Sequence, residues 1–215
     1  ISILDNNKIY CSGSGWGGYV WSNGVLAPQI YAGGVVAPTN IAQDAAKAND
    51  TSIVQVGDVN VIAFFKDNGS STTNTYANDG YSYVTYPAIA SGTPFLNRVA
   101  AIVNGSYYVA GIVDSFAFIA KYNQRSFTLD NTWGTNGVAS FEISNFPYNR
   151  FADLKIQPDG KVVALYEGGF NNETFISSYV MRFNTNGALD TGFSTDGILD
   201  QPYSYNIAFL PNNVL

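Results

Sequence analysis

The chain repeats itself, and this feature constrains its fold more than any other. Residues 130–138 (DNTWGTNGV) match residues 190–198 (DTGFSTDGI), and residues 119–123 (IAKYN) match residues 180–184 (VMRFN). Weaker copies of the same motifs precede them, over residues 64–81 and 21–35. A spacing of about 45 to 60 residues between copies is typical of solenoids, propellers and other repeat architectures. We therefore expect four copies of one structural unit, two clear and two degenerate.

A short polar turn between apolar residues recurs between these motifs, at residues 3–10, 48–54, 102–109, 156–163 and 209–215. Asn-Gly and Asp-Gly steps supply the positive φ that a two-residue type I′ hairpin requires, and Asn tolerates it better than most residues. Each turn therefore predicts a β-hairpin, and each copy holds four strand-sized segments. The alanine-rich residues 41–47 align with residues 151–156, so we expect a strand there despite their helix propensity.

Four short strands cannot bury both faces of a sheet by themselves, so the copies are expected to pack face to face. The sequence accordingly predicts an all-β chain, a β-propeller or, less favoured, a stacked solenoid. The expected organisation is one repeat domain over residues 1–215, with copies at approximately 1–40, 41–95, 96–150 and 151–215. Either the two ends complete one shared blade, or the chain is a segment of a larger propeller. We favour the segment, because four copies are at the lower limit of the about four to eight blades that propellers have.

The recurring motifs are similar to those of a known family. The pattern Lys/Arg-aromatic-Asn, then Leu-Asp-x-x-aromatic-Gly/Ser-x-x-Gly-Val/Ile, then Gln-Pro-Asp-Gly-Lys-Val-Val, is clearest over residues 118–198. It resembles the delta-60 repeat of large bacterial secreted and surface proteins. The resemblance implies propeller blades and a location outside the cell, secreted or on the cell surface, and it implies no catalytic residues. The copies at both ends of the chain depart from the pattern, with Asn-Asn in place of Asp-Gly.

Charge and composition exclude several classes of function. The chain has 10 Lys and Arg against 16 Asp and Glu, a net charge of −6, so nucleic acid is not an expected partner. Its longest apolar stretches, such as residues 61–65 and 99–103, are too short to insert into a membrane. The absence of histidine removes the Ser-His-Asp triad, the usual proton shuttle and the commonest transition-metal ligand. We expect no cofactor and no catalysis, and we interpret Cys11, the single cysteine, as a buried core residue.

Several residues recur at the same position of successive copies. The aromatics Tyr76, Trp133 and Phe193 precede Gly80, Gly137 and Gly197 by four residues. We expect these aromatics to be core anchors before glycine turns, in preference to platforms for sugar stacking. Lys66, Lys121 and Arg182 are expected on an exposed or inter-blade face, paired with an Asp of a neighbouring blade. Asp130 and Asp190 are expected to cap main-chain N–H groups in Asx turns, with a Ca²⁺ site that includes Asp196 as the alternative.

The connections between the repeated motifs vary most, and a rigid scaffold binds its partners through such loops. The variable connections are residues 14–18, 69–73, 81–94, 145–149 and 168–174. The aromatic residues in these connections are the candidates for binding: Trp16, Tyr81, Tyr83, Tyr86, Phe146, Tyr148 and Phe170. The favoured function is a non-catalytic secreted or surface-exposed module that binds a protein or a surface glycan.

Two alternative functions are open at this point. In the first, the chain is a structural or docking component of a larger assembly, such as a translocon-associated, adhesin-like or virion surface protein. A fixed partner and a large apolar surface patch would favour this alternative. In the second, the chain is a glycan-active enzyme, which without histidine would need a pair of carboxylates. The candidates for that pair are Asp153, Asp159, Glu167 and Glu173.

Overall fold

The computed structural model describes residues 2–3, 8–13, 16–22, 25–26, 42–49, 52–57, 61–66, 81–83, 92, 95–102, 105–123, 128–142, 148–171, 174–202, 204 and 206–209. Within these ranges, every element of regular secondary structure is a β-strand. No helix in the same residues is long and apolar enough to cross a membrane. The prediction of an all-β fold is confirmed.

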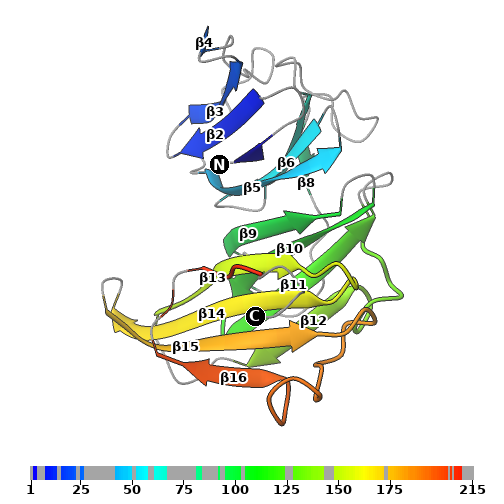
Figure 1. The fold of residues 1–215 in the computed structure, drawn as a ribbon, viewed down its shortest axis with the longest axis vertical. Helices are drawn as coiled ribbons and strands as arrows, with labels where there is room; N and C mark the ends of the chain where they lie inside the picture. Colours follow the sequence, from blue (N-terminus) through cyan, green and yellow to red (C-terminus); the bar gives the residue numbers. More distant parts are fainter. Residues whose placement is uncertain are drawn as a thin grey trace.

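The described strands form four antiparallel sheets, each built from one stretch of the chain (Figure 1). The first sheet contains β1 (Ser2–Ile3), β2 (Lys8–Gly13), β3 (Trp16–Ser22) and β4 (Val25–Leu26). The second contains β5 (Ala42–Asn49), β6 (Ser52–Gly57), β7 (Val61–Lys66) and β8 (Tyr81–Tyr83). The third contains β9 (Phe95–Ala101), β10 (Ser106–Val113), β11 (Phe116–Asn123) and β12 (Val138–Glu142). The fourth contains β13 (Tyr148–Ile156), β14 (Val162–Asn171), β15 (Thr174–Phe183) and β16 (Ile198–Gln201).

Each sheet is a meander in which every strand pairs with the next strand along the chain. The alanine-rich segment is strand β5, as expected. Its residue Ala46 lies opposite Val54 of β6, and this pairing outweighs the helix propensity of alanine. Strands β9 and β13 begin at Phe95 and Tyr148, one and three residues before the starts expected for the third and fourth copies.

The hairpin between β13 and β14 differs from the expected type I′ turn. The N–H of Gly160 donates to the carbonyl of Gln157 at 2.8 Å, and the N–H of Gln157 donates to the carbonyl of Lys161 at 2.8 Å. The turn is therefore centred on Pro158 and Asp159, and Gly160 follows it with a φ of +85°. Proline fixes φ near about −65°, which suits the first central position of a type I turn and excludes type I′. The hairpin forms as predicted, with a three-residue loop that ends in a glycine bulge.

Two apolar cores hold neighbouring sheets together. Between the second and third sheets, Val54 and Val56 pack with Val99, Val109 and Phe118. Between the third and fourth sheets, the core contains Tyr108, Ile119, Trp133, Phe151, Leu154, Ala164, Tyr166, Met181 and Phe183, with others. These contacts place β9 between β5 and β13, as Figure 1 shows.

The third sheet is buried on both faces. Tyr107 and Val109 of β10 belong to the core shared with the second sheet, whereas Tyr108 and Ala110 belong to the core shared with the fourth. Successive side chains of a strand point to opposite faces of the sheet. A strand that is covered on both sides therefore needs a continuous apolar run, and this explains why β10 lacks the alternation of a half-exposed strand.

Some residues expected in long connections lie in strands. Strand β3 begins at Trp16, β8 consists of Tyr81–Tyr83, and β13 begins at Tyr148. Strand β14 extends to Asn171, which lies opposite Thr174 of β15. Register shifts beside Gly168 and Gly169 accompany this extension, since bulges let a strand bend and continue. Connections that look long in the sequence are therefore shorter than predicted.

Candidate functional site

Trp133 is a buried anchor between the third and fourth sheets. Its side chain is 1% exposed and lies edge to face with Tyr108, with 5.5 Å between the ring centroids. The ring of Phe183 in the fourth sheet is 6.4 Å away. Phe193 has the same motif position in the fourth sheet, but it is only half-buried there, and the guanidinium of Arg182 lies over its ring at 4.7 Å. The equivalent Tyr76 and Gly80 fall outside the described residues.

The glycine of the motif closes the same turn in both sheets. Gly137 and Gly197 each have a φ of +92°, a conformation that favours glycine. Their N–H groups donate to the carbonyls of Trp133 and Phe193, each at 2.8 Å. The repeated sequence therefore folds into a repeated turn, and the glycine is required by its backbone conformation.

Asp130 and Asp190 begin this turn. Oδ1 of each accepts a main-chain N–H from two residues further on, from Thr132 and from Gly192, both at 3.1 Å. This is the Asx-turn geometry that places a carboxylate over nearby N–H groups. Among the residues that the structure describes, no three His, Cys, Asp or Glu side chains gather as a metal site.

The carboxylates of Asp130 and Asp190 also form the ion pairs of the motif. Lys121 Nζ lies 2.8 Å from Asp130 Oδ2, and Asp190 Oδ2 pairs with Arg182 Nε at 2.8 Å and with Lys161 Nζ at 2.9 Å. Every one of these pairs lies within a single sheet, so the expected pairing with a neighbouring sheet is wrong for Lys121 and Arg182. The reason is the turn itself, which returns Asp130 beside Lys121 and joins their main chains by a hydrogen bond of 2.9 Å. The side chain of Lys66 is outside the described part.

These hydrogen bonds favour the ionised carboxylates. The bond from Lys121 lowers the pKa of Asp130, with help from Thr132. The bond from Lys161 lowers the pKa of Asp190, and Arg182 acts in the same direction. Both aspartates are therefore engaged by main-chain N–H groups and by cations of their own sheet.

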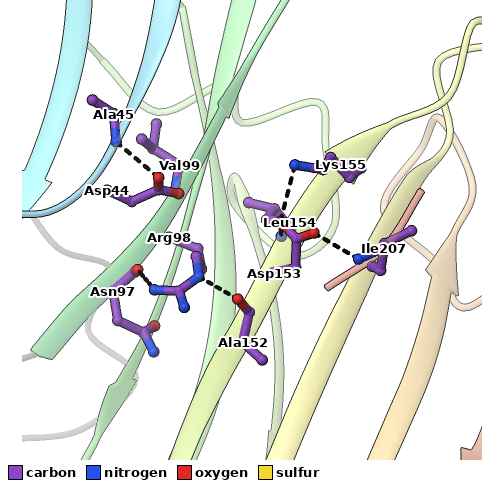
Figure 2. A network of polar contacts seen from close by, with 10 residues as sticks. All are labelled: Asp44, Ala45, Asn97, Arg98, Val99, Ala152, Asp153, Leu154, Lys155 and Ile207. Atoms are coloured by element: carbon purple, nitrogen blue, oxygen red, sulfur yellow. Dashed lines mark hydrogen bonds and ion pairs between the residues drawn. The ribbon is translucent and has the colours of Figure 1, made fainter. Parts of the chain in front are cut away.

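A polar network joins the first strands β5, β9 and β13 of successive sheets and continues to Ile207 (Figure 2). The carboxylate of Asp44 in β5 accepts the N–H of Val99 in β9 at 3.0 Å, 55 residues further along the chain. The carboxylate of Asp153 in β13 accepts the N–H of Ile207 at 2.8 Å, 54 residues further along. Each carboxylate also accepts the N–H of the residue that follows it. The two aspartates thus make the same contact in two copies of the repeat.

Arg98 holds the equivalent position in β9. A register shift precedes Asp44, Arg98 and Asp153 in their own strands, which matches the three positions. Arg98 Nε donates to the carbonyl of Ala152 in β13. The side-chain amide of Asn97 donates to the carbonyl of Phe151 at 2.8 Å. The third sheet therefore also contacts the main chain of the sheet that follows it, with donors in place of acceptors.

Burial controls the electrostatics of this network. Burial raises the pKa of Asp44, against the lowering effects of the Val99 N–H and of the charge on Arg98. Burial likewise lowers the pKa of Arg98, while the carboxylates of Asp44 and Asp153 act in the opposite direction. Lys155 Nζ lies 3.2 Å from Asp153 Oδ1. Because the groups of the network bind main-chain groups between sheets, we interpret it as a brace between sheets.

A further charged pair lies at the end of the fourth sheet where β13 begins. Glu167 of β14 is fully buried, and its Oε2 accepts a hydrogen bond from Arg150 Nε at 2.7 Å. The Arg150 side chain is 38% exposed. In the third sheet the equivalent cross-strand pair is Phe95 opposite Ile112. A charged pair therefore replaces an apolar pair.

Sequence reasoning missed this pair as a unit. Residues 165–168 (LYEG) replace residues 110–113 (AGIV) of the preceding copy, and this replacement is visible in the sequence. Arg150, however, is matched to Phe95 only when the register shift in each first strand is known. The sequence therefore indicates Glu167, whereas its pairing with Arg150 can be found only when the bulges are known.

Two exposed aromatics lie at this end of the sheets. Tyr148, at the start of β13, and Phe95, at the start of β9, are each 39% exposed. Strands β9 and β13 run in the same direction. Asn97 donates to the carbonyl of Phe151, and the next residue, Arg98, donates to the carbonyl of the next residue, Ala152. The remaining predicted binding residues, or their side chains, fall outside the described part: Trp16, Tyr81, Tyr83, Tyr86, Phe146 and Phe170.

The carboxylates considered for acid-base chemistry have different surroundings. Asp159 lies in the β13–β14 turn, where its Oδ1 accepts the N–H of Lys161 at 3.1 Å. Asp153 belongs to the brace between sheets, and Glu167 pairs with Arg150. Glu173 is outside the described residues.

Comparison with known proteins identifies the architecture. No protein-family model matches the sequence, and no curated protein sequence is similar to it. Among solved structures, the chain is similar to the WD40 β-propeller domain of Doa1, with a TM-score of 0.56 and 13% identity over 98% of this chain and 56% of that one. It is also similar to a protein of unknown function from Bacteroides caccae, with a TM-score of 0.51 and 14% identity over 95% of this chain and 62% of that one.

The fold is that of a β-propeller. The four sheets are propeller blades, as the sequence predicted, and β5, β9 and β13 are the first strands of the second, third and fourth blades. The chain spans 56% and 62% of the lengths of the two propellers it matches. Asp44 and Arg98 therefore link the first strands of consecutive blades, and Asp153 extends the same brace from β13 to Ile207.

Proposed function

We propose that the chain is a non-catalytic propeller module, secreted or displayed at the cell surface, that binds a protein partner at the end of the blades where β9 and β13 begin. The observation that carries this proposal is the exposure of Phe95 and Tyr148, each 39% exposed at the start of the first strand of its blade. Aromatic side chains are enriched in protein interfaces and dominate their binding energy. A rigid scaffold that presents them at one end suits recognition of a partner surface.

Further features support the proposal. The Arg150–Glu167 pair lies at the same end, since Tyr148 is opposite Gly169 near the end of β14. The non-catalytic character rests on the absence of histidine and on the use of Asp153 and Asp159 as acceptors for main-chain N–H groups. The extracellular location rests on the resemblance of the recurring motifs to the delta-60 repeat. Loss of the protein from intact cells treated with an external protease tests that location.

Site-specific photocrosslinking tests the binding end. A photoreactive benzoylphenylalanine replaces Tyr148 in one variant and Thr195, an exposed residue of the turn at the opposite end, in the control. After irradiation in an extract of the source cells, we expect one defined protein to be crosslinked at position 148 and not at position 195. Equal yields at the two positions, or a glycan ligand on a glycan array with no protein adduct at position 148, would contradict the proposal.

A further inference from the structure

Residues 206–209 follow the fourth blade and occupy the place of a first strand. The N–H of Ile207 donates to Asp153 of β13 at 2.8 Å, just as the N–H of Val99 in β9 donates to Asp44 of β5 at 3.0 Å. Val99 belongs to the first strand of the blade that follows Asp44. The same contact therefore places residues 206–209 where the first strand of a fifth blade lies.

One face of this segment has the residue positions of a contact between blades, and that face is exposed. Asn206 directly precedes the bound N–H, as Arg98 does in β9. Asn206 is exposed, whereas Arg98 is half-buried. Ala208 is exposed as well, whereas Ala100, at the same position of β9, is buried in the core between the third and fourth blades. A further blade would cover this face as the fourth blade covers the third.

The sequence of the segment repeats that of the first hairpin. Residues 207–215 (IAFLPNNVL) and residues 1–9 (ISILDNNKI) are identical at four of nine positions, and both are apolar at the first, third, fourth and ninth. In the first blade, Ile3 of β1 lies opposite Ile9 of β2. Phe209 corresponds to Ile3 in this alignment. The segment therefore has the sequence pattern that pairs with β2.

The edge of β2 can receive a longer first strand. Within the described residues, β1 covers β2 only at Ile9 and Tyr10, although β2 extends from Lys8 to Gly13. The first strands β5, β9 and β13 have eight, seven and nine residues. Asn206 precedes the part of the segment that matches β1, so it extends the pairing further along β2.

We propose that residues 206–209 of one molecule pair with β2 of a second copy of this chain, in place of β1, and complete its first blade. Figure 1 shows the first and fourth blades at opposite ends of the row, so the segment and β2 lie apart within one molecule. The first blade of the second copy then packs on the fourth blade of the first copy, through the contact that joins consecutive blades.

The reciprocal contact closes a ring of two chains, as expected for a symmetric oligomer. The eight blades of such a ring are within the range of about four to eight that propellers have. The chain spans 56% and 62% of the two propellers it matches, as an arc of a larger ring does. This inference does not depend on the binding end proposed above.

Cysteine crosslinking tests the strand pairing. Ser2 lies opposite Tyr10 in the first blade, so Ala208 takes that place in the completed blade and Ile207 lies opposite Cys11, the single cysteine. Opposed residues of neighbouring strands are close enough for a disulfide. We expect Ile207→Cys to form a covalent dimer under mild oxidation, with a disulfide between positions 207 and 11 in peptide mapping.

Two control variants show whether the crosslink is specific. Thr195→Cys places a thiol in an exposed turn of the fourth blade, and Ile207→Cys combined with Cys11→Ser removes the partner thiol. We expect neither to form a covalent dimer. Equal yields with Thr195→Cys would overturn the inference. A disulfide between positions 207 and 11 of the same molecule, recognised by mixing ¹⁵N-labelled and unlabelled chains, would also overturn it.

Native mass spectrometry gives an independent test without a crosslink. At about 100 µM protein we expect the unmodified chain to be a dimer. Ala208 is exposed in the single chain and covered in the ring, so Ala208→Arg should fold normally by circular dichroism and weaken the dimer at least about tenfold. Thr195→Arg should associate as the unmodified chain does. A monomeric unmodified chain, or equal association of the two variants, would overturn the inference and leave the proposed function standing.

Discussion

The carboxylate of Asp153 accepts a hydrogen bond from the main-chain N–H of Ile207 at 2.8 Å, 54 residues further along the chain. Asp44 makes the same bond to Val99, 55 residues further along. Each aspartate lies just after a register shift in the first strand of its blade. A β-bulge re-aims a side chain in this way, and here it turns the carboxylate toward the following copy of the repeat.

Replacing Asp44 tests the contribution of this contact to stability. Asp44→Ala removes the acceptors for the N–H groups of Ala45 and Val99, and we expect it to lower the free energy of unfolding by about 1–3 kcal/mol. Asp44→Asn keeps one acceptor, so it should cost less than alanine at pH 7. Urea denaturation of both variants measures the difference, and equal losses would contradict the role of the acceptors.

The pH dependence of the same asparagine variant has a defined sign. Burial raises the pKa of Asp44 above 3.8 in the folded chain, so the ionised carboxylate lowers stability at neutral pH. That loss is relieved as the pH falls through the raised pKa toward 3.8. The stability of the unmodified chain relative to Asp44→Asn should therefore increase on acidification. Urea denaturation at a series of pH values measures it, and a constant difference would refute this explanation.

Asp190 should show the opposite pH dependence. Hydrogen bonds from Lys161 and Arg182 hold its pKa below 3.8, so the ionised form stabilises the fold above pH 3.8. This contribution is lost as the pH falls from 3.8 through the lowered pKa. The advantage of the unmodified chain over Asp190→Asn should shrink in that window, in denaturant titrations at each pH. Parallel pH profiles for the two proteins would show that the ion pairs do not act on stability.

Trp133 and Phe193 allow one motif position to be compared in two environments. Trp133 is 1% exposed between blades, whereas Phe193 is half-buried. Trp133→Ala should lower the free energy of unfolding by about 3–5 kcal/mol. Phe193→Ala should cost less by at least about 1 kcal/mol, because less apolar area is uncovered. Chemical denaturation followed by circular dichroism distinguishes the two, and equal losses would indicate that Phe193 is covered in solution.

Transferring the apolar pair of the third blade into the fourth tests whether the Arg150–Glu167 pair costs stability. Arg150→Ala alone leaves Glu167 buried without its cation, and we expect a loss of about 3 kcal/mol or more. The double variant Arg150→Phe with Glu167→Ile removes both charges and should be at least as stable as the unmodified chain. Thermal and urea unfolding of the three proteins measure this. A double variant as unstable as Arg150→Ala would show that the pair is needed by the fold.

The repeat and its turns were predictable because their physical requirements are local. A positive φ after Trp133 and after Phe193 calls for glycine, and Gly137 and Gly197 mark the turn in the sequence. The hairpin after β13 was equally visible, although Pro158 selects a type I turn in place of type I′. Local backbone chemistry of this kind leaves a signature in consecutive residues.

The contacts between blades were not predictable in the same way. The bulges before Arg98 and Asp153 change the cross-strand register of the first strands, and no residue type in the sequence predicts them. Without that register, Arg150 could not be matched to Glu167. The partner of Lys121 was placed in the wrong blade for a related reason, since the path of the turn that returns Asp130 is a three-dimensional property.

The polar contacts that join the blades end on the main chain. Asp44 and Asp153 reach N–H groups, Arg98 reaches a carbonyl, and the N–H of Gly134 meets the carbonyl of Asn186 at 2.7 Å. Every residue type has a carbonyl, and every type except proline has an N–H. The polar contacts between copies therefore do not depend on which side chains the receiving positions carry. Those receiving positions can diverge without a matched substitution in the adjoining copy, provided that proline stays out of positions 99 and 207, whereas the apolar cores between blades still require matched side chains.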